Sequence, residues 1–184
     1  VLLFGAVGSL MPAKMTGALD WLSNGNGAAS AKAIPSDYQT DQDKLVEMKL
    51  EKVIMVASQQ GPVMLLSEKS GKRYLPISIG MSEARAIAIV LQGIKPARPL
   101  TSDLLRGVID ALGADVRFVL IEDQRDGVFY AKVILGVKDK TIEMDSRPSD
   151  AMALAIRTGA HIYAREKLLE TAPSPADVKA KADM

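Results

Sequence analysis

The sequence contains no cysteine, a single histidine and few aromatic residues. Without cysteine the chain has no disulfides, no zinc–thiolate site and no cysteine nucleophile. Because His161 is the only histidine, a catalytic dyad or a metal site built on several histidines is also excluded. Aromatic residues account for 4% of the chain, which argues against extensive surfaces for stacking nucleic-acid bases.

An excess of charge of one sign is lacking too. The chain has 23 lysines and arginines against 22 aspartates and glutamates, a net charge of +1. Proteins that bind nucleic acids usually carry a clear basic excess, so the bulk charge gives no such signal, although it does not exclude a local basic groove. With 184 residues and 48% hydrophobic content, the chain is large enough for one domain and an extension.

Residues 1–44 differ in composition from the rest of the chain. The apolar run at 1–11 is too short to span a bilayer, and the small residues at 23–33 include segments that resemble cleavage sites. Two interpretations stay open: a secretory signal of an exported protein, or a flexible N-terminal extension of a cytoplasmic one. We expect an α+β domain at 45–172 without a membrane span, and a disordered polar tail at 173–184.

One segment of the chain occurs twice. The segment Tyr74–Ile89 recurs as Thr141–Ile156, with the shared pattern Ser-acid-Ala-x-Ala-(Ile/Leu)-Ala-Ile and an offset of 150 − 83 = 67 residues. A fixed offset of this kind predicts a repeated supersecondary unit, here three strands and a helix. The sequence therefore predicts an α+β fold with a mixed β-sheet, short helices and an internal duplication of a β-β-β-α unit.

Hydrophobic periodicity and turn residues place the individual elements. We expect strands at 46–56, 63–68, 73–79, 116–121, 128–135, 141–144 and 161–164, and helices at 82–91, 101–112 and 149–158. Pro76 lies within one of these strands and cannot donate a ladder hydrogen bond, so this strand should be at an edge of the sheet, or the proline at a bulge.

Each expected helix begins with a hydroxyl residue and a carboxylate. Such pairs are ordinary helix caps, since a hydroxyl accepts from the first backbone N–H groups and an acid favours the positive end of the helix. Capping does not require arginine, yet Arg98 and Arg147 each precede a proline just before two of these helices. A residue before proline is held extended, so a guanidinium should lie beside each helix start.

Two interpretations of these acids and arginines compete. In one, they form internal ion pairs that hold the fold together. In the other, some acids bind Mg²⁺ or Mn²⁺, which prefer oxygen ligands, and the arginines bind phosphate oxygens. A site of the second kind can activate water for phosphodiester hydrolysis without histidine.

At these residues the chain resembles the bifunctional nuclease domain family. The resemblance extends from about Val46 to Leu169 and is carried by three segments in order: Leu75-Pro-Ile-Ser-Ile-Gly80 followed by Glu83, then Arg98-Pro-Leu-Thr-Ser-Asp-Leu104, then Asp145-Ser-Arg-Pro-Ser-Asp-Ala151. It implies a compact α+β domain, a homodimer, and nuclease activity on DNA and RNA.

From the resemblance and the charged residues we derive a set of candidate site residues. Glu83, Asp103, Asp145 and Asp150 are expected to act as base or cation ligands, with Asp145 and Asp150 as the metal ligands. The expected substrate-binding residues are Arg98, Thr101, Arg147 and Ser149. The alternative function is a non-catalytic module that binds a ligand or partner, in which the acids and arginines are structural.

The chain departs from the family pattern in one position. Family members commonly have a histidine between the threonine and aspartate of the Arg-Pro segment, where this chain has Ser102. A mechanism with that histidine as base would be impaired here, whereas one that uses carboxylates would not. We interpret His161 as a partly buried histidine at a strand edge rather than a catalytic one. Basic residues in two hairpins are further candidate phosphate contacts: Lys69, Lys72, Arg73, Lys138 and Lys140.

Overall fold

The computed structural model describes residues 34, 38, 44–56, 61–71 and 73–170. Its strands are β1 (Leu45–Val56), β2 (Gly61–Glu68), β3 (Tyr74–Ser78), β4 (Ala114–Arg125), β5 (Val128–Val137), β6 (Lys140–Ser146) and β7 (His161–Arg165). Its helices are α1 (Met81–Leu91), α2 (Thr101–Ala111), α3 (Pro148–Thr158) and the short 3-10 helix η4 (Glu166–Leu168). These elements confirm the expected strands and helices, with boundaries that differ by a few residues.

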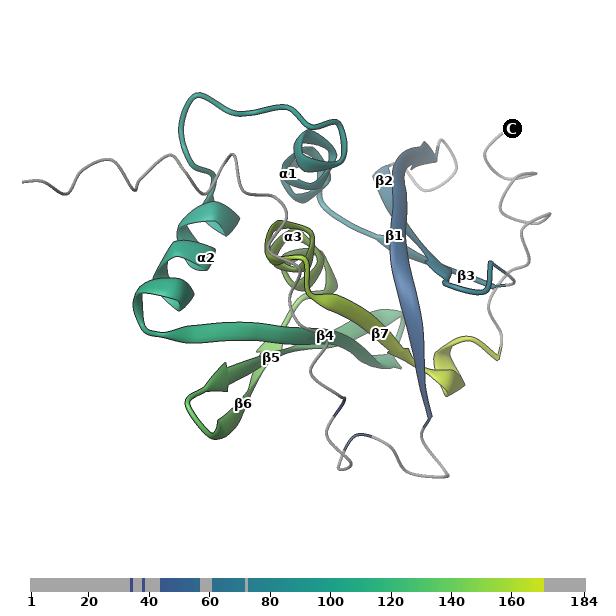
Figure 1. The fold of residues 1–184 in the computed structure, drawn as a ribbon. Coiled ribbons are helices and arrows are strands. Elements are labelled where there is room, and N and C mark those ends of the chain that lie inside the picture. The colour runs from purple at the N-terminus through teal and green to yellow at the C-terminus, as the bar shows by residue number, and fades with distance from the viewer. Residues whose placement is uncertain (1–33, 35–37, 39–43, 57–60, 72, 171–184) are drawn as a thin grey trace, which may run out of the picture.

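The strands of the described residues form one mixed seven-stranded sheet in the order β3-β2-β1-β7-β4-β5-β6 (Figure 1). Only β4 and β7 pair in parallel, at Phe118–Ile121 against His161–Ala164. The fold is therefore α+β, as the sequence predicts. Three antiparallel strands followed by a helix occur twice in the element order, while an origin by internal duplication stays a prediction.

Strand β3 lies at one edge of the sheet, which confirms the expectation from Pro76. Pro76 pairs with Leu65 of β2, and no other described strand pairs with β3. A central strand would lose a ladder hydrogen bond at proline, whereas an edge strand can direct this position away from its neighbour.

The three helices pack against one face of the sheet and form the main hydrophobic core with it (Figure 1). Helix α3 lies between α1 and α2 and contacts both. Its side chains facing this core are mostly small: Ala151, Ala153 and Ala155 are buried, as is Ala84 of α1. Small side chains allow helices to approach closely, so the alanines of the repeated pattern bring the starts of α1 and α3 together.

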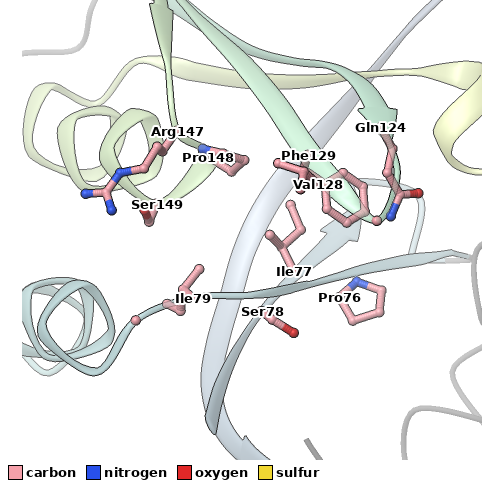
Figure 2. Close-up of a pocket in the computed structure, with 12 residues that line it drawn as sticks. Pro76, Ile77, Ser78, Ile79, Gln124, Val128, Phe129, Arg147, Pro148 and Ser149 are labelled. Carbon is pink, nitrogen blue, oxygen red and sulfur yellow. The ribbon is translucent and has the colours of Figure 1, made fainter.

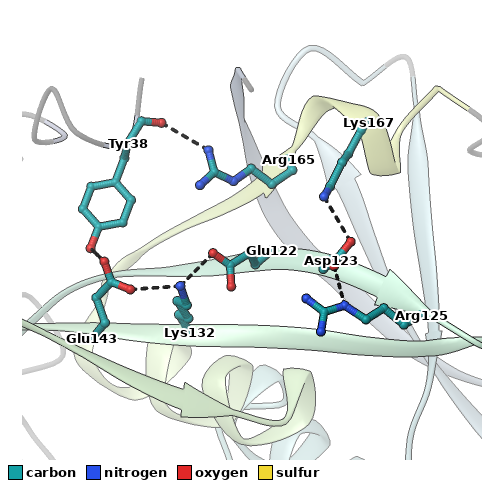
Figure 3. A network of polar contacts seen from close by, with 8 residues as sticks. All are labelled: Tyr38, Glu122, Asp123, Arg125, Lys132, Glu143, Arg165 and Lys167. Carbon is teal, nitrogen blue, oxygen red and sulfur yellow. Dashed lines mark hydrogen bonds and ion pairs between the residues drawn. The ribbon is translucent and has the colours of Figure 1, made fainter. Parts of the chain in front are cut away.

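The opposite face of the sheet has a second, smaller core. Tyr38 is buried there, and its ring meets that of Phe118 edge-on at 5.2 Å. A chain of polar contacts continues across this face (Figure 3), in which the Tyr38 hydroxyl donates to Glu143 and Lys132 links Glu143 to Glu122. Tyr38 falls within the expected leader, so at least this residue packs on the domain.

Most of the expected leader at 1–44 and all of the expected tail at 173–184 lie outside the described residues. Within the described part of the chain, no helix has both the length and the apolar character needed to span a membrane.

Candidate functional site

A cavity of about 560 Å³ opens where three connections of the fold meet. They are the end of β3 leading into α1, the β4–β5 hairpin, and the turn from β6 into α3 (Figure 2). The lining residues are Pro76, Ile77, Ser78, Ile79, Gly80, Gln124, Gly127, Val128, Phe129, Arg147, Pro148 and Ser149. Two of the three expected motif helices thus begin at this cavity.

Arg147 links the two carboxylates that the repeat places at equivalent positions. Its Nε donates to Asp150 Oδ2 at 2.7 Å and its Nη2 to Asp150 Oδ1 at 3.2 Å. The same Nη2 lies 3.0 Å from Glu83 Oε1. One guanidinium therefore holds the carboxylates of α1 and α3 side by side at the rim of the cavity.

Local backbone preferences explain this placement. Arg147 is the N-cap of α3 and precedes Pro148, which holds it extended at φ −70° and ψ 147°. Gly80 is the corresponding N-cap of α1. A Cβ built on Gly80 would lie 2.2 Å from Glu83 Oε2, so glycine leaves the space into which the Glu83 carboxylate folds.

Arg147 remains a charged and accessible group. Its side chain is 66% exposed. The hydrogen bond to Asp150 raises the pKa of Arg147 above its ordinary value, so the guanidinium is positive at any physiological pH. Nη1 makes no hydrogen bond or ion pair within the described part of the chain, and its two N–H donors point to no protein acceptor there. A phosphate could use these donors without first breaking an existing contact.

Asp103 lies away from the cavity beside Arg147. Its Oδ1 accepts from Arg157 Nε at 2.5 Å, and both side chains are buried, at 7% and 4% exposed. Its Oδ2 accepts from the backbone N–H of Leu100 at 2.7 Å and so caps α2. Arg157 also donates to the carbonyls of Ala153 and Ala86. The pair therefore ties the three helices together and is sealed from solvent.

The remaining candidates are divided between the cavity and other surfaces. Ser149 is buried and lines the cavity beside Arg147. Asp145 is exposed on β6 and is the register partner of Lys132, which places it on the face of the sheet opposite the helices. Arg98 is exposed in the α1–α2 connection, and Thr101 lines a second cavity of about 600 Å³.

The structure thus brings together Glu83, Arg147, Ser149 and Asp150, and it leaves Asp103, Asp145, Arg98 and Thr101 apart from them. Among the described residues, no three carboxylate or histidine side chains are close enough to hold a metal ion. Two carboxylates, Glu83 and Asp150, lie at the cavity, and both are in contact with Arg147.

His161 lies outside the cavity. Its Nδ1 is 2.8 Å from Glu47 Oε1, which also accepts from Lys69 Nζ at 2.7 Å. Its ring stacks on Tyr163, with centroids 6.2 Å apart. Hydrogen bonds from Lys69 and His161 outweigh the effect of burial and lower the pKa of Glu47. These contacts fit a partly buried histidine at the start of β7, which is how the sequence was interpreted.

The expected basic hairpin is engaged in ion pairs. Arg73 Nε lies 3.0 Å from Glu68 Oε2, and its Nη1 lies 2.6 Å from Glu166 Oε1. Hydrogen bonds to these two carboxylates raise the pKa of Arg73. Lys72 lies outside the described residues.

Sequence reasoning missed three residues that matter here. Arg157 lies within the expected helix 149–158 directly after Ala153-Leu-Ala-Ile156, and an arginine at the end of such an apolar run is itself a signal of a buried ion pair. Gln124 and Phe129 were read as turn and strand, and the sequence carries no signal that their side chains line a cavity.

Comparison with known proteins supports the resemblance seen in the motifs. The family model described as the bifunctional nuclease domain matches residues 64–177. An uncharacterized protein of Mycobacterium tuberculosis is 50% identical over 114 residues, which are 62% of this chain and 68% of that protein.

Plant proteins are more distant. Bifunctional nuclease 1 of Oryza sativa subsp. japonica is 25% identical over 109 residues, and bifunctional nuclease 2 of Arabidopsis thaliana is 26% identical over 98 residues. The matches cover 58% and 52% of this chain but only 33% and 30% of the plant proteins. The plant proteins thus contain long regions without a counterpart in the match.

Proposed function

Because this chain belongs to the bifunctional nuclease domain family, we propose that it is a nuclease that cleaves phosphodiester bonds of DNA, RNA or both at the cavity beside Arg147. The observation that carries this proposal is the position of one exposed guanidinium between Glu83 and Asp150. At this cavity two of the three family motif segments meet, the one that ends at Gly80 and the one that contains Arg147 and Ser149. The names of the plant relatives support the same activity.

In this proposal Arg147 binds the phosphate of the scissile linkage. A planar guanidinium pairs well with two phosphate oxygens, and Nη1 is available for the first contact. As negative charge grows on the non-bridging oxygens in the transition state, the fixed positive charge stabilises it. Ser149, next along the chain and also at the cavity, is a second candidate donor to the phosphate.

The carboxylates have different roles in this scheme. Asp150 takes a proton from the attacking water, the new P–O bond forms, and the leaving oxygen departs with a proton from solvent. Phosphate oxygens that take over Arg147 donors release Asp150 from its contact at 2.7 Å and leave it free to act as base. Glu83 keeps the guanidinium in place and is therefore a positioning residue.

The other expected site residues receive other roles. We assign Asp103 to holding α2 and α3 together, because its carboxylate is buried against Arg157. Asp145, Arg98 and Thr101 are exposed and apart from Arg147, where they can contact a longer nucleic-acid strand but not the scissile phosphate. Dependence on Mg²⁺ or Mn²⁺ stays a prediction; of its two expected ligands, Asp150 lies at the cavity with Arg147 and Asp145 lies on the other face of the sheet.

The test is cleavage of labelled single-stranded and duplex DNA and RNA by purified protein, in EDTA, Mg²⁺ or Mn²⁺. Arg147→Lys should lower the cleavage rate by roughly 100-fold or more, because lysine cannot form the planar two-point contact. Arg125→Lys is the matched control, since Arg125 is 67% exposed and forms a similar surface pair with Asp123. Equal cleavage by both variants would place the activity elsewhere. No cleavage by the parent protein would favour the alternative of a non-catalytic binding module.

We also propose that the protein forms a homodimer through α2. The outward side of this helix carries Leu104, Leu105 and Val108, and the C-cap Leu112 follows them; all four are exposed, with Leu112 at 76%. No charged residue lies in this stripe, since Arg106 and Asp110 project to the other side of the helix. A second copy supplies an identical uncharged stripe, so two α2 helices can pair across a two-fold axis without like-charge repulsion.

A further inference from the structure

The cavity beside Arg147 has two chemically different parts. Arg147 and Ser149 form the polar end, where α3 begins. The rest is walled mainly by apolar side chains, namely Pro76, Ile77, Val128 and Phe129 (Figure 2). A site for phosphate alone would not need this apolar part, because phosphate is recognised by charge and hydrogen bonds.

We propose that the apolar part holds one unstacked nucleobase of a single-stranded nucleic acid, adjacent to the phosphate at Arg147. This inference rests on the proposed function for the position of the phosphate. The cavity, at about 560 Å³, is within the range of roughly 300–1,000 Å³ in which proteins enclose small organic groups. Bases that leave the helical stack are typically bound on an aromatic ring and read by hydrogen bonds to their edges.

Phe129 and Gln124 supply these two kinds of contact. They are register partners across the β4–β5 hairpin, so their side chains lie on the same face of it. The connecting residues Asp126 and Gly127 have φ of 50° and 80°, as in a tight two-residue turn, which fixes this register. Among the described residues, Phe129 has the only aromatic ring that lines the cavity, and the exposed Gln124 amide has both a donor and an acceptor for a base edge.

The opposite wall is formed by β3. In Figure 2 Ile77 and Ile79 of β3 point toward the hairpin that carries Phe129, and the Pro76 ring lies along the edge of the strand. Because β3 is an edge strand, no further strand of the described residues covers this wall. A flat base can therefore enter between the aliphatic side chain of Ile77 and the ring of Phe129, while its sugar and phosphate stay at the rim with Arg147.

This arrangement selects the form of the substrate. A base inside the cavity cannot be paired with a complementary strand. A duplex must therefore open a base pair before it binds, which costs free energy. Single strands, loops and frayed ends present unpaired bases without that cost. The structure of the cavity therefore favours single-stranded over duplex nucleic acid.

The test measures binding rather than cleavage. Fluorescence anisotropy gives Kd for three eight-nucleotide probes in EDTA: a phosphorothioate-linked single strand that resists hydrolysis, its duplex, and the same backbone with abasic residues. The single strand should bind at least ten-fold more tightly than either of the others. Phe129→Leu, which keeps apolar volume but removes the ring, should weaken single-strand binding by roughly 5- to 100-fold.

Tyr130→Leu is the matched control, because Tyr130 is an exposed aromatic residue one position along β5 and points to the other face. Equal binding of base-bearing and abasic probes, or parent-like binding by Phe129→Leu, would overturn the inference. Cleavage that needs Arg147 but proceeds equally on duplex would overturn it while the proposed function stands. Base-dependent binding through Phe129 without cleavage would support it and contradict the nuclease proposal.

Discussion

Arg147 Nη2 lies 3.0 Å from Glu83 Oε1, and this contact joins the start of α3 to the first turn of α1. Both helices reach this point because alanines at their interface allow close packing. Asp150 completes the cluster on the other side of the guanidinium. These three residues carry the proposed cleavage, whereas the buried pair of Asp103 and Arg157 stabilises the fold.

Arg147→Ala should leave stability almost unchanged. The residue is largely exposed, and exposed ion pairs contribute about 0–1 kcal/mol to the free energy of unfolding. Urea unfolding of the variant should therefore agree with that of Arg125→Ala within about 1 kcal/mol, while its cleavage rate falls roughly 100- to 1,000-fold. A loss of several kcal/mol would instead assign Arg147 to the structural framework.

Asp103→Ala should have the opposite effect. It leaves the buried Arg157 guanidinium without its carboxylate and removes the cap of α2. Removing one partner of a buried pair typically costs about 3–5 kcal/mol. Urea unfolding measures this loss, and Asp110→Ala is the control, because the Asp110 side chain on the same helix is solvent-exposed. Cleavage per folded molecule should be preserved, so an inactive but stable Asp103→Ala would contradict the assignment.

Gly80→Ala tests the position of Glu83 without altering its charge. The backbone at Gly80, with φ −74°, is accessible to alanine, but the new Cβ would displace the Glu83 carboxylate. Because a flexible side chain can move, we expect stability to change by no more than about 0.5 kcal/mol. Cleavage should fall roughly 10- to 100-fold as Arg147 loses its support. Parent-like cleavage would show that Glu83 does not position the guanidinium.

Tyr38→Phe should destabilise the protein in a pH-dependent way. The hydrogen bond from the Tyr38 hydroxyl, with Lys132, lowers the pKa of Glu143 below its ordinary value of 4.5. A carboxyl group whose pKa is lower in the folded than in the unfolded state stabilises the fold at pH values above its unfolded-state pKa. This contribution is lost as the pH falls through its folded-state pKa. The variant should thus be less stable by about 0.5–1.5 kcal/mol at pH 7, and the difference should shrink below pH 4.5. Unfolding at a series of pH values measures it, and a constant difference would contradict this origin.

The homodimer proposal can be tested by cross-linking, since the chain has no cysteine of its own. Val108→Cys places a thiol in the exposed apolar stripe near the centre of α2, where the two copies should meet. Mild oxidation should give a disulfide-linked dimer of this variant. Asp110→Cys, on the charged side of the same helix, should stay monomeric under the same conditions. Equal cross-linking of both variants, or of neither, would exclude α2 as the interface.

The sequence predicted the elements well because their signals are local. Pro76 indicated an edge strand from its missing N–H, and the serines before Glu83 and Asp150 marked two helix starts within two residues. The expectation that these serines cap the helices was wrong, because Gly80 and Arg147 are the N-caps and neither helix has a side-chain cap hydrogen bond. The Arg-Pro lead-in also predicted that Arg147 would lie beside a helix start with carboxylates in reach. In each case the physical cause lies within a few residues of the signal.

The parts that the sequence did not predict depend on contacts between distant segments. Asp103 and Arg157 are 54 residues apart, and only the packing of α2 on α3 makes them a buried pair. Asp145 lies on the face of the sheet opposite the helices. Strand alternation shows which residues of β6 share a face with Asp145, but which face the helices cover is decided by tertiary packing. Tyr38 lies in a segment whose composition indicates a leader, and its contact with Phe118 becomes visible only in the folded domain.

The central claim is that the Arg147 cluster cleaves the phosphodiester bond with Asp150 as the base. The most direct measurement is the single-turnover cleavage rate of Asp150→Asn with protein in excess over a labelled single strand. Asp139→Asn, in the exposed β5–β6 turn, is the control. The account predicts a fall of roughly 100- to 10,000-fold for Asp150→Asn, with the parent rate for the control. Cleavage by Asp150→Asn at the parent rate would contradict it.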